Sequence, residues 1–174
     1  FQKEINKTLK TQDPLATYRV KILIWRDWGG LYAPKAETVS YAIFASALER
    51  SEYRLDEKSF VVDLFKDHYV NNGLLEQLKS NNKLTHVLAG IYARENDYDS
   101  CLLLNHEKKV VEGISGNLFL VKDYKIKTPP ISDGCLKGVM RGVILEILAK
   151  HPDYIVTEAS ISPFELQKAD ELFL

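Results

Sequence analysis

Hydrophobic and polar positions follow short, regular patterns along the chain, and these patterns predict strands separated by a few helices. In residues 1–10 the apolar positions recur four apart, which predicts an amphipathic helix. Residues 17–26 alternate apolar and polar side chains, and residues 39–47 do so again, as half-buried strands do. The segment between them, residues 28–34, holds two glycines and a proline and is predicted to be a loop.

Beyond residue 48 the chain becomes charged without a clear period, so residues 49–58 are interpreted as a linker. Short apolar runs then predict strands at 59–65, 100–104, 110–112, 118–122, 126–128, 154–158 and 171–174. Helical patterns predict helices at 83–96, 139–150 and 163–169. In the first of these helices the buried stripe is expected to consist of Leu84, Val87, Leu88 and Ile91.

Clustered strands with interspersed helices favour an α/β (mixed α+β) fold in two lobes. The expected division gives a smaller N-terminal lobe at residues 1–52 and a larger lobe at residues 53–174. The sequence begins inside a predicted helix and ends on a predicted strand, so we expect it to be a piece of a longer protein, truncated at both ends.

Composition excludes several classes of function. The 174 residues include 23 basic and 24 acidic side chains, which leaves no electrostatic signature for nucleic acid or an anionic membrane. No apolar run approaches the roughly 20 residues that a membrane span needs. Cys101 and Cys135 show neither metal-ligand spacing nor a disulfide framework, so a reducing, cytoplasmic location is the expectation.

Familiar catalytic motifs are absent from the sequence. It contains no phosphate-binding loop ending in Gly-Lys-Ser/Thr, no dinucleotide fingerprint, no His-Glu-x-x-His and no Gly-x-Ser-x-Gly. The histidines are scattered, and His86, on a predicted helix, is interpreted as structural. The absence of these motifs excludes many enzyme classes.

Three weaker features could carry chemistry. Glu112 ends a predicted strand before a loop of small residues, where it is either a ligand-binding acid or the solvated acid of an ordinary hairpin. Lys79 precedes an apolar helix and is either a desolvated, reactive amine or a solvated lysine. Residues 134–141 lead from a glycine-containing loop into a helix, which is either an anion site or a plain junction. Together, an amine, an acid and a phosphate cradle are the parts that a pyridoxal phosphate enzyme needs.

The order of five motifs makes the pattern specific. They are Lys-x-x-Asn-x-Leu at 79–84, Glu-Gly-x-x-x-Asn-x-Phe at 112–119, Thr-Pro-Pro at 128–130, Leu-x-Gly-Val-Met-Arg at 136–141 and Ala-Asp-Glu-Leu-Phe at 169–173. With them the chain resembles the class IV (fold-type IV) pyridoxal-phosphate enzymes from about residue 17 to residue 174. This family comprises branched-chain aminotransferases, D-amino-acid aminotransferases and aminodeoxychorismate lyases.

The resemblance implies pyridoxal 5'-phosphate as cofactor and gives roles to several residues. Lys79 is implied to be the catalytic lysine that bonds covalently to the cofactor, and Glu112 to bind the pyridine nitrogen. Leu136 is implied to pack against the ring, and the helix start at Gly138, Val139 and Met140 to bind the phosphate. Further walls of the phosphate site are expected before residue 1 and after residue 174.

The substrate side is implied less fully. Arg26, at the end of a strand, is either a ligand of the substrate carboxylate or a surface arginine, and Lys83 stands at a position that varies in the family. Family members are usually homodimers that act on small amino-acid-like substrates.

The motif at 138–141, Asn82-Lys83-Leu84 and the loop after Arg26 look most like those of 4-amino-4-deoxychorismate lyases. The expected reaction is therefore release of pyruvate from 4-amino-4-deoxychorismate to give 4-aminobenzoate, a step of the folate pathway. A branched-chain or D-amino-acid aminotransferase is the alternative, and a non-catalytic relative or fragment is a further one.

Overall fold

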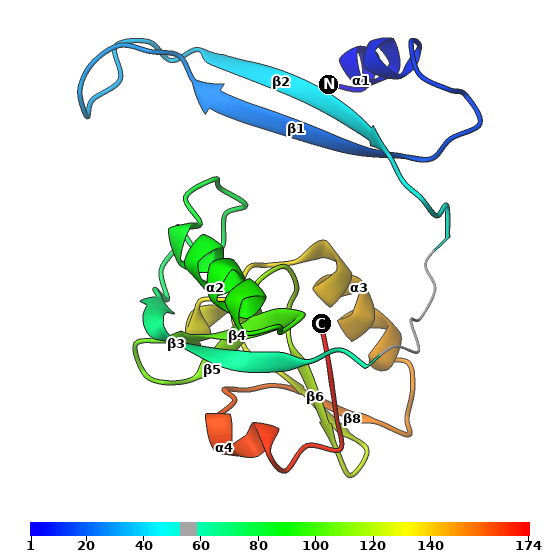
Figure 1. Ribbon diagram of the computed structural model, residues 1–174, viewed down its shortest axis with the longest axis vertical. Coiled ribbons are helices and arrows are strands. Elements are labelled where there is room, and N and C mark those ends of the chain that lie inside the picture. The colour runs from blue at the N-terminus through cyan, green and yellow to red at the C-terminus, as the bar shows by residue number, and fades with distance from the viewer. Residues whose placement is uncertain (53–58) are drawn as a thin grey trace. The chain divides into compact units, whose positions relative to one another are not determined.

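The chain forms two compact units in a computed structural model that describes residues 1–52 and 59–174 (Figure 1). The units are Phe1–Glu57 and Lys58–Leu174. Residues 53–58, which belong to the predicted linker, lie outside the described residues.

The N-terminal unit is a helix followed by a long two-stranded hairpin. Helix α1 (Gln2–Leu9) precedes β1 (Tyr18–Arg26) and β2 (Val39–Ala47), as the sequence pattern predicts. The strands pair antiparallel from Tyr18 opposite Ala47 to Arg26 opposite Val39, so Arg26 ends β1 where the loop begins.

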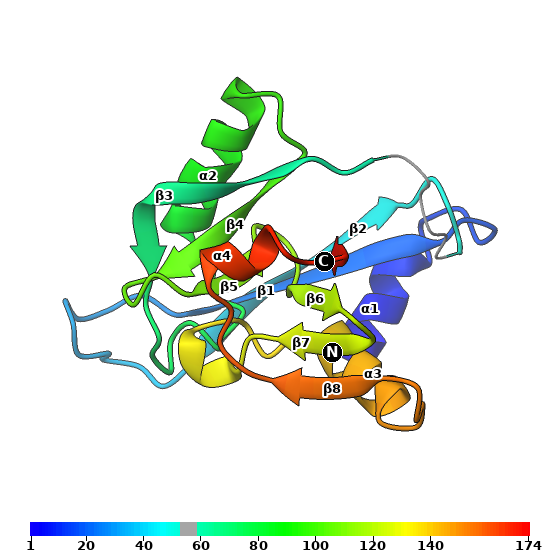
Figure 2. The same ribbon diagram turned by 90° about the horizontal axis from the view of Figure 1, so that it is seen from below.

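The described residues of the C-terminal unit form seven strands in two sheets. Helices connect some of these strands along the chain (Figure 2). Its strands are β3 (Val62–Val70), β4 (Ser100–Asn105), β5 (Val110–Gly113), β6 (Phe119–Lys122), β7 (Lys125–Thr128), β8 (Ile155–Glu158) and β9 (Glu171–Phe173). Its helices are α2 (Leu84–Glu95), the short 3-10 helix η1 (Ile131–Asp133), α3 (Val139–Leu148) and α4 (Pro163–Leu166).

Two parallel crossovers organise these sheets. Strand order is β3-β4-β5 in one sheet and β8-β7-β6-β9 in the other. The β3–β4 pair is parallel and is connected through α2, while the β7–β8 pair is parallel and is connected through α3. Parallel neighbours require such a crossover, because a tight turn would make the second strand run antiparallel to the first.

Strand β4 lies at the centre of the core and is buried along its whole length. Cys101 and Leu103 pack in one apolar cluster with Ala89 and Ala93 of α2. Leu102 and Leu104 pack in a second cluster with residues of β5 and β6 and with Ile161. A strand covered on both faces is expected to be apolar at every position, and each fully buried leucine contributes about 1.5–3 kcal/mol.

Two sequence predictions differ from the structure, one about the buried face of α2 and one about the bounds of β3. The stripe expected to be buried on α2 is exposed at Leu84 (67 %), Val87 (56 %) and Ile91 (38 %), and the prediction is confirmed only at Leu88, which packs against the first cluster. The helix instead approaches the sheet through Ala89 and Ala93, because small side chains permit closer contact of helix and strands. Strand β3 also begins later and ends later than predicted, and it continues through the polar residues 66–68 because pairing with β4 resumes at Val70.

Candidate active site

The Glu112 carboxylate is buried and has hydrogen-bond partners on both of its oxygens. Glu112 lies on β5 opposite Leu103 of the central strand, and the residue is only 5 % exposed. Its Oε2 accepts a hydrogen bond of 2.8 Å from the backbone N–H of Leu136, and its Oε1 lies 3.0 Å from Nε2 of His86. The interpretation of Glu112 as the solvated acid of a hairpin is therefore wrong.

Gly113 and Gly116 allow the chain to turn tightly directly after Glu112. The Gly113 N–H donates to the Gly116 carbonyl at 2.8 Å, and Glu112 and Asn117 form an isolated bridge. A Cβ on Gly113 would lie 2.8 Å from the Leu174 side chain, which is closer than side chains pack. The loop thus returns the chain beside Glu112 at Asn117.

Asn117 connects this loop to the start of α3. Its Nδ2 donates to the Leu136 carbonyl at 2.8 Å, while a Cβ on Gly138 would lie only 2.1 Å from its Oδ1. No other residue type fits at Gly138 without moving the Asn117 amide. Glycine is required at position 138 because the Asn117 side chain lies so close, and not because of the backbone conformation, since φ of Gly138 is an ordinary −68°.

Helix α3 presents an uncapped N-terminus beside these groups. Gly138 is the N-cap and offers no side chain, and the first helical residues Val139 and Met140 are 84 % and 57 % exposed. Free backbone N–H groups at a helix N-terminus favour a phosphate group. Arg141 anchors the helix from beneath, since its buried guanidinium donates to the Pro129 carbonyl at 2.9 Å and to Glu158 at 2.5 Å.

The structure thus brings Glu112, Leu136, Gly138, Val139 and Met140 to one place. Lys79 and Lys83 lie in the segment that leads into α2, with Lys83 at the helix N-cap.

Lys79 is exposed, and within residues 1–52 and 59–174 its amine has no hydrogen-bond or ion-pair partner. Arg26 belongs to the N-terminal unit.

Two residues of the candidate site carry no functional signal in the sequence. Asn117 belongs to the motif at 112–119 without an implied role, and the position of His86 on a helix predicts only a structural role. His86 lies 26 positions before Glu112, so only the packing of α2 on the β3-β4-β5 sheet brings them together. No periodicity or spacing rule in the sequence signals that contact.

Cys135, next to Leu136, is buried as a thiol. Its Sγ lies 3.6 Å from the carbonyl oxygens of Pro129 and Pro130. Burial raises the pKa of Cys135 from 9.0 to about 11, and Arg141 opposes this effect while Glu112 adds to it. The thiol is a protonated filler of the site wall and no nucleophile.

This raised pKa predicts a pH-dependent loss of stability. The folded protein holds the Cys135 proton more tightly than the unfolded chain does, so the stabilisation is complete below pH 9.0 and is lost as the pH rises towards about 11. We expect a loss on the order of 2 kcal/mol across this window. Urea unfolding of the wild type and of Cys135→Ala at both ends of the window measures it, because the variant lacks this part of the slope. Equal slopes in the two proteins would contradict the assignment.

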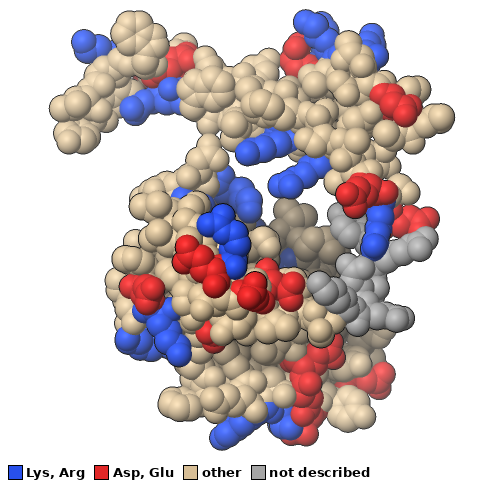
Figure 3. All heavy atoms as spheres, viewed as in Figure 1, with Lys and Arg blue, Asp and Glu red and all other residues tan. Residues whose placement is uncertain are grey.

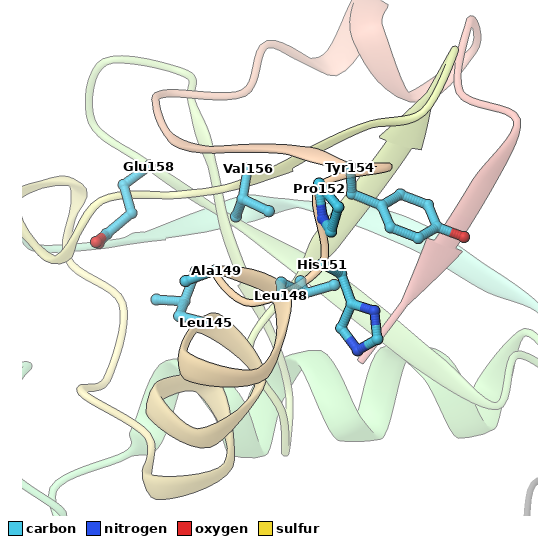
Figure 4. Close-up of a pocket in the computed structure, with 8 residues that line it drawn as sticks. All are labelled: Leu145, Leu148, Ala149, His151, Pro152, Tyr154, Val156 and Glu158. Carbon is cyan, nitrogen blue, oxygen red and sulfur yellow. The ribbon is translucent and has the colours of Figure 1, made fainter.

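A separate hollow lies at the other end of α3, in a region without these groups (Figure 4). Its lining comes from the C-terminal half of α3, from β8 and from the turn between them, and includes Glu158, the partner of Arg141.

Among the described residues, no cluster of three or more His, Cys, Asp or Glu side chains could hold a metal ion. None of the described helices is long and apolar enough to cross a membrane. On the faces seen in Figure 3, basic and acidic side chains are interspersed.

Comparisons with known proteins agree with this fold. The profile of the amino-transferase class IV family matches residues 1–174. The chain therefore belongs to the class IV aminotransferases. The expected family and the mixed α/β, fold-type IV architecture are confirmed.

A Methanocaldococcus jannaschii protein with a provisional branched-chain-amino-acid aminotransferase name is 41 % identical over 97 residues, which are 56 % of this chain and 33 % of that protein. The chain thus spans about a third of that relative's length.

Two solved structures show the same fold. The pyridoxal-phosphate form of the branched-chain aminotransferase from Thermobaculum terrenum has a TM-score of 0.78 at 24 % identity, over 99 % of this chain and 56 % of that chain. A provisionally named 4-amino-4-deoxychorismate lyase from Legionella pneumophila has a TM-score of 0.76 at 22 % identity, over 99 % of this chain and 62 % of that chain. The Thermobaculum terrenum structure is the pyridoxal-phosphate form of that enzyme, and pyridoxal 5'-phosphate is the cofactor that the resemblance of this sequence implies.

The residues present fit that cofactor. A buried carboxylate suits a protonated ring nitrogen, and the Gly138 position leaves no room for a side chain where α3 opens. The Glu112 carboxylate is hydrogen-bonded at Leu136, and the close contact is at Gly138, two residues further on. Leu136 is the residue that the resemblance implies to pack against the ring.

Proposed function

We propose that the full-length protein is a pyridoxal-phosphate-dependent transaminase that acts on branched-chain amino acids. The observation that carries this proposal is the buried Glu112 carboxylate, which is joined through Leu136 and Asn117 to the uncapped start of α3. An anionic acceptor and a phosphate-binding helix start on one short segment are what a phosphorylated pyridine requires.

In this proposal four groups of the chain hold the cofactor. Glu112 accepts a hydrogen bond from the ring nitrogen, and Leu136 packs against the ring. The backbone N–H groups of Val139 and Met140, which follow Gly138, bind the phosphate. When bound, the cofactor supplies an electron sink for the pair of electrons left by a departing α-proton.

Lys79 does the proton chemistry. Its amine is exposed and has no partner among the described residues, so it is available to hold the cofactor covalently and to act as a base. It would accept the α-proton of the substrate and hold it for return, while the cofactor would supply the electron sink; release of the oxo acid would consume one water molecule. Arg26 and Lys83 are proposed as ligands of the substrate carboxylate, because cations bind carboxylates by charge-assisted hydrogen bonds.

The choice of transamination is supported by the sequence relatives, whose names are those of branched-chain aminotransferases. The lyase reaction on 4-amino-4-deoxychorismate is the second candidate. It is favoured by Gly138-Val139-Met140-Arg141 and by Asn82-Lys83-Leu84, which look like the lyase versions of these motifs. Both reactions would use Lys79 as base and Glu112 as the acceptor at the ring nitrogen, so they differ only in the pocket walls.

One assay of the full-length protein separates the two reactions. The protein is given pyridoxal 5'-phosphate and, in three parallel reactions, leucine with 2-oxoglutarate, D-alanine with 2-oxoglutarate, or 4-amino-4-deoxychorismate. The formation of glutamate from leucine and from D-alanine and the formation of 4-aminobenzoate are followed. Glutamate without 4-aminobenzoate is the expected outcome. 4-Aminobenzoate without glutamate would replace the proposal by the lyase, a response only to D-amino acids would indicate that transaminase class, and neither product would indicate a non-catalytic relative.

The assembly expected for the full-length protein is a homodimer. Light scattering of the full-length protein measures its mass directly, and a monomeric mass with full activity would contradict that expectation.

A further inference from the structure

The His86 imidazole contacts the Glu112 carboxylate, and the proposed function leaves this contact without a role. His86 lies in the first turn of α2, and its Nε2 is 3.0 Å from Oε1 of Glu112. Both side chains are largely withdrawn from solvent, with relative exposures of 13 % for His86 and 6 % for Glu112. A withdrawn polar pair of this kind is held in one geometry, unlike a surface ion pair.

The two donors grip opposite oxygens of the carboxylate. The Leu136 N–H occupies a lone pair of Oε2, and His86 occupies a lone pair of Oε1. A carboxylate has about four such acceptor positions, so each oxygen retains one for a third donor. Rotation of the carboxylate would break both bonds, and its orientation is therefore fixed before any ligand arrives.

His86 can act in this way only if its Nε2 carries a proton. An ionised carboxylate is an acceptor and has no proton to give. The imidazole must then be either the neutral tautomer with the proton on Nε2 or the imidazolium. Cys135 also interacts electrostatically with Glu112, and burial raises the pKa of this thiol to about 11, which keeps it neutral through the ordinary pH range.

We propose that His86 is a positioning residue for Glu112: its Nε2–H locks the carboxylate so that the remaining lone pairs face the ring nitrogen of the cofactor. The role toward the ring rests on the proposed function. The hydrogen bond to Glu112 does not, because it joins two residues of this chain.

Proton–nitrogen correlation NMR on the full-length protein without cofactor tests the hydrogen bond. The spectrum of the His86 ring distinguishes a proton on Nε2 from a proton on Nδ1 alone. A protonated Nε2 is expected, as is a Leu136 amide proton protected from exchange. An unprotonated Nε2 would overturn the proposal, since two acceptors would then face each other.

Three variants test the role toward the cofactor. His86→Leu removes the donor, His86→Gln keeps an N–H near the position of Nε2, and His106→Leu is the matched control. His106 resembles His86 in that its Nε2 makes one contact, at 3.1 Å to Asn71, but it lies on the exposed turn before β5. A hydrogen bond to a charged group is worth about 1.5–3 kcal/mol, which corresponds to at least about a 10-fold change in affinity.

We expect His86→Leu to bind pyridoxal 5'-phosphate at least about 10-fold more weakly and to change the absorbance maximum of the bound cofactor. His86→Gln should stay within about 3-fold of the wild type, since it restores the donor, and His106→Leu should be unchanged. Wild-type affinity and absorbance in His86→Leu would overturn the role, as would equal losses in the Leu and Gln variants. If the wild type itself binds no cofactor, the proposed function fails, whereas the NMR measurement still decides the hydrogen bond.

Discussion

Lys79→Ala should abolish turnover, lowering kcat by about 10⁴-fold or more. The residue is proposed both to bond to the cofactor and to carry the α-proton, and proton transfer by a positioned group alone contributes about 10²–10⁴-fold. Stability should change by less than about 0.5 kcal/mol, because the side chain is exposed and has no described partner. Steady-state kinetics of the full-length protein, with urea unfolding beside them, measure both quantities.

The position of the covalent bond gives a second readout for the same variant. Borohydride reduction of the wild type with cofactor, followed by peptide mapping, should place the adduct on Lys79, and Lys79→Ala should yield none. Lys150→Ala, an exposed lysine after α3, serves as the matched control and should behave as the wild type. An adduct on another lysine, or brisk turnover by Lys79→Ala, would remove Lys79 from the mechanism.

Local pattern predicts the elements of this chain well where one face or one residue type decides the structure. The alternation in β2 locates that strand at its observed bounds, and α3 begins at Val139 as predicted because Gly138 ends the loop. Sheet topology is different. The parallel pairing of β3 with β4 joins two strands that are separated in the chain by α2. The pattern within each strand does not indicate which other strand it pairs with.

The error on α2 has a specific physical cause. The sequence predicts that the stripe with the largest apolar side chains is buried, yet of that stripe only Leu88 packs against the core cluster, beside the fully buried Ala89 and Ala93. A period of 3.6 residues identifies apolar positions, and it does not say which of two apolar faces meets a strand. Close approach of a helix to a sheet favours the smaller side chains.

The sequence predicts those candidate site residues that lie within the motifs, and it misses the one that lies outside them. Motif order singles out Glu112, Leu136 and the start of α3 as candidates, and in the structure hydrogen bonds join Glu112 and Asn117 to Leu136, just before α3. The second donor to Glu112, on His86, comes from an element that the motifs do not connect to it. A contact made only through tertiary packing leaves no trace in spacing along the chain.

Glu112→Gln should lower kcat by about 10²–10³-fold at saturating cofactor, because a neutral amide cannot hold the proton on the ring nitrogen that makes the ring an electron sink. The amide also has only one acceptor atom for the two donors that now bind the carboxylate, the Leu136 N–H and His86. We therefore expect a loss of about 1–3 kcal/mol in the free energy of unfolding as well. Stopped-flow or steady-state assays give the first effect, and urea unfolding gives the second.

The choice of substitution decides what this experiment reports. Glu112→Ala would leave the buried Leu136 N–H unpaired and open a void beside it, so its loss of activity would mix chemistry with unfolding. Glu107→Gln is the matched control, since this carboxylate pairs with Lys109 at 2.6 Å on an exposed turn, where an ion pair is worth about 0–1 kcal/mol. It should leave kcat unchanged. Normal turnover by Glu112→Gln with reduced stability would mean that the buried acid serves the fold and not the ring nitrogen.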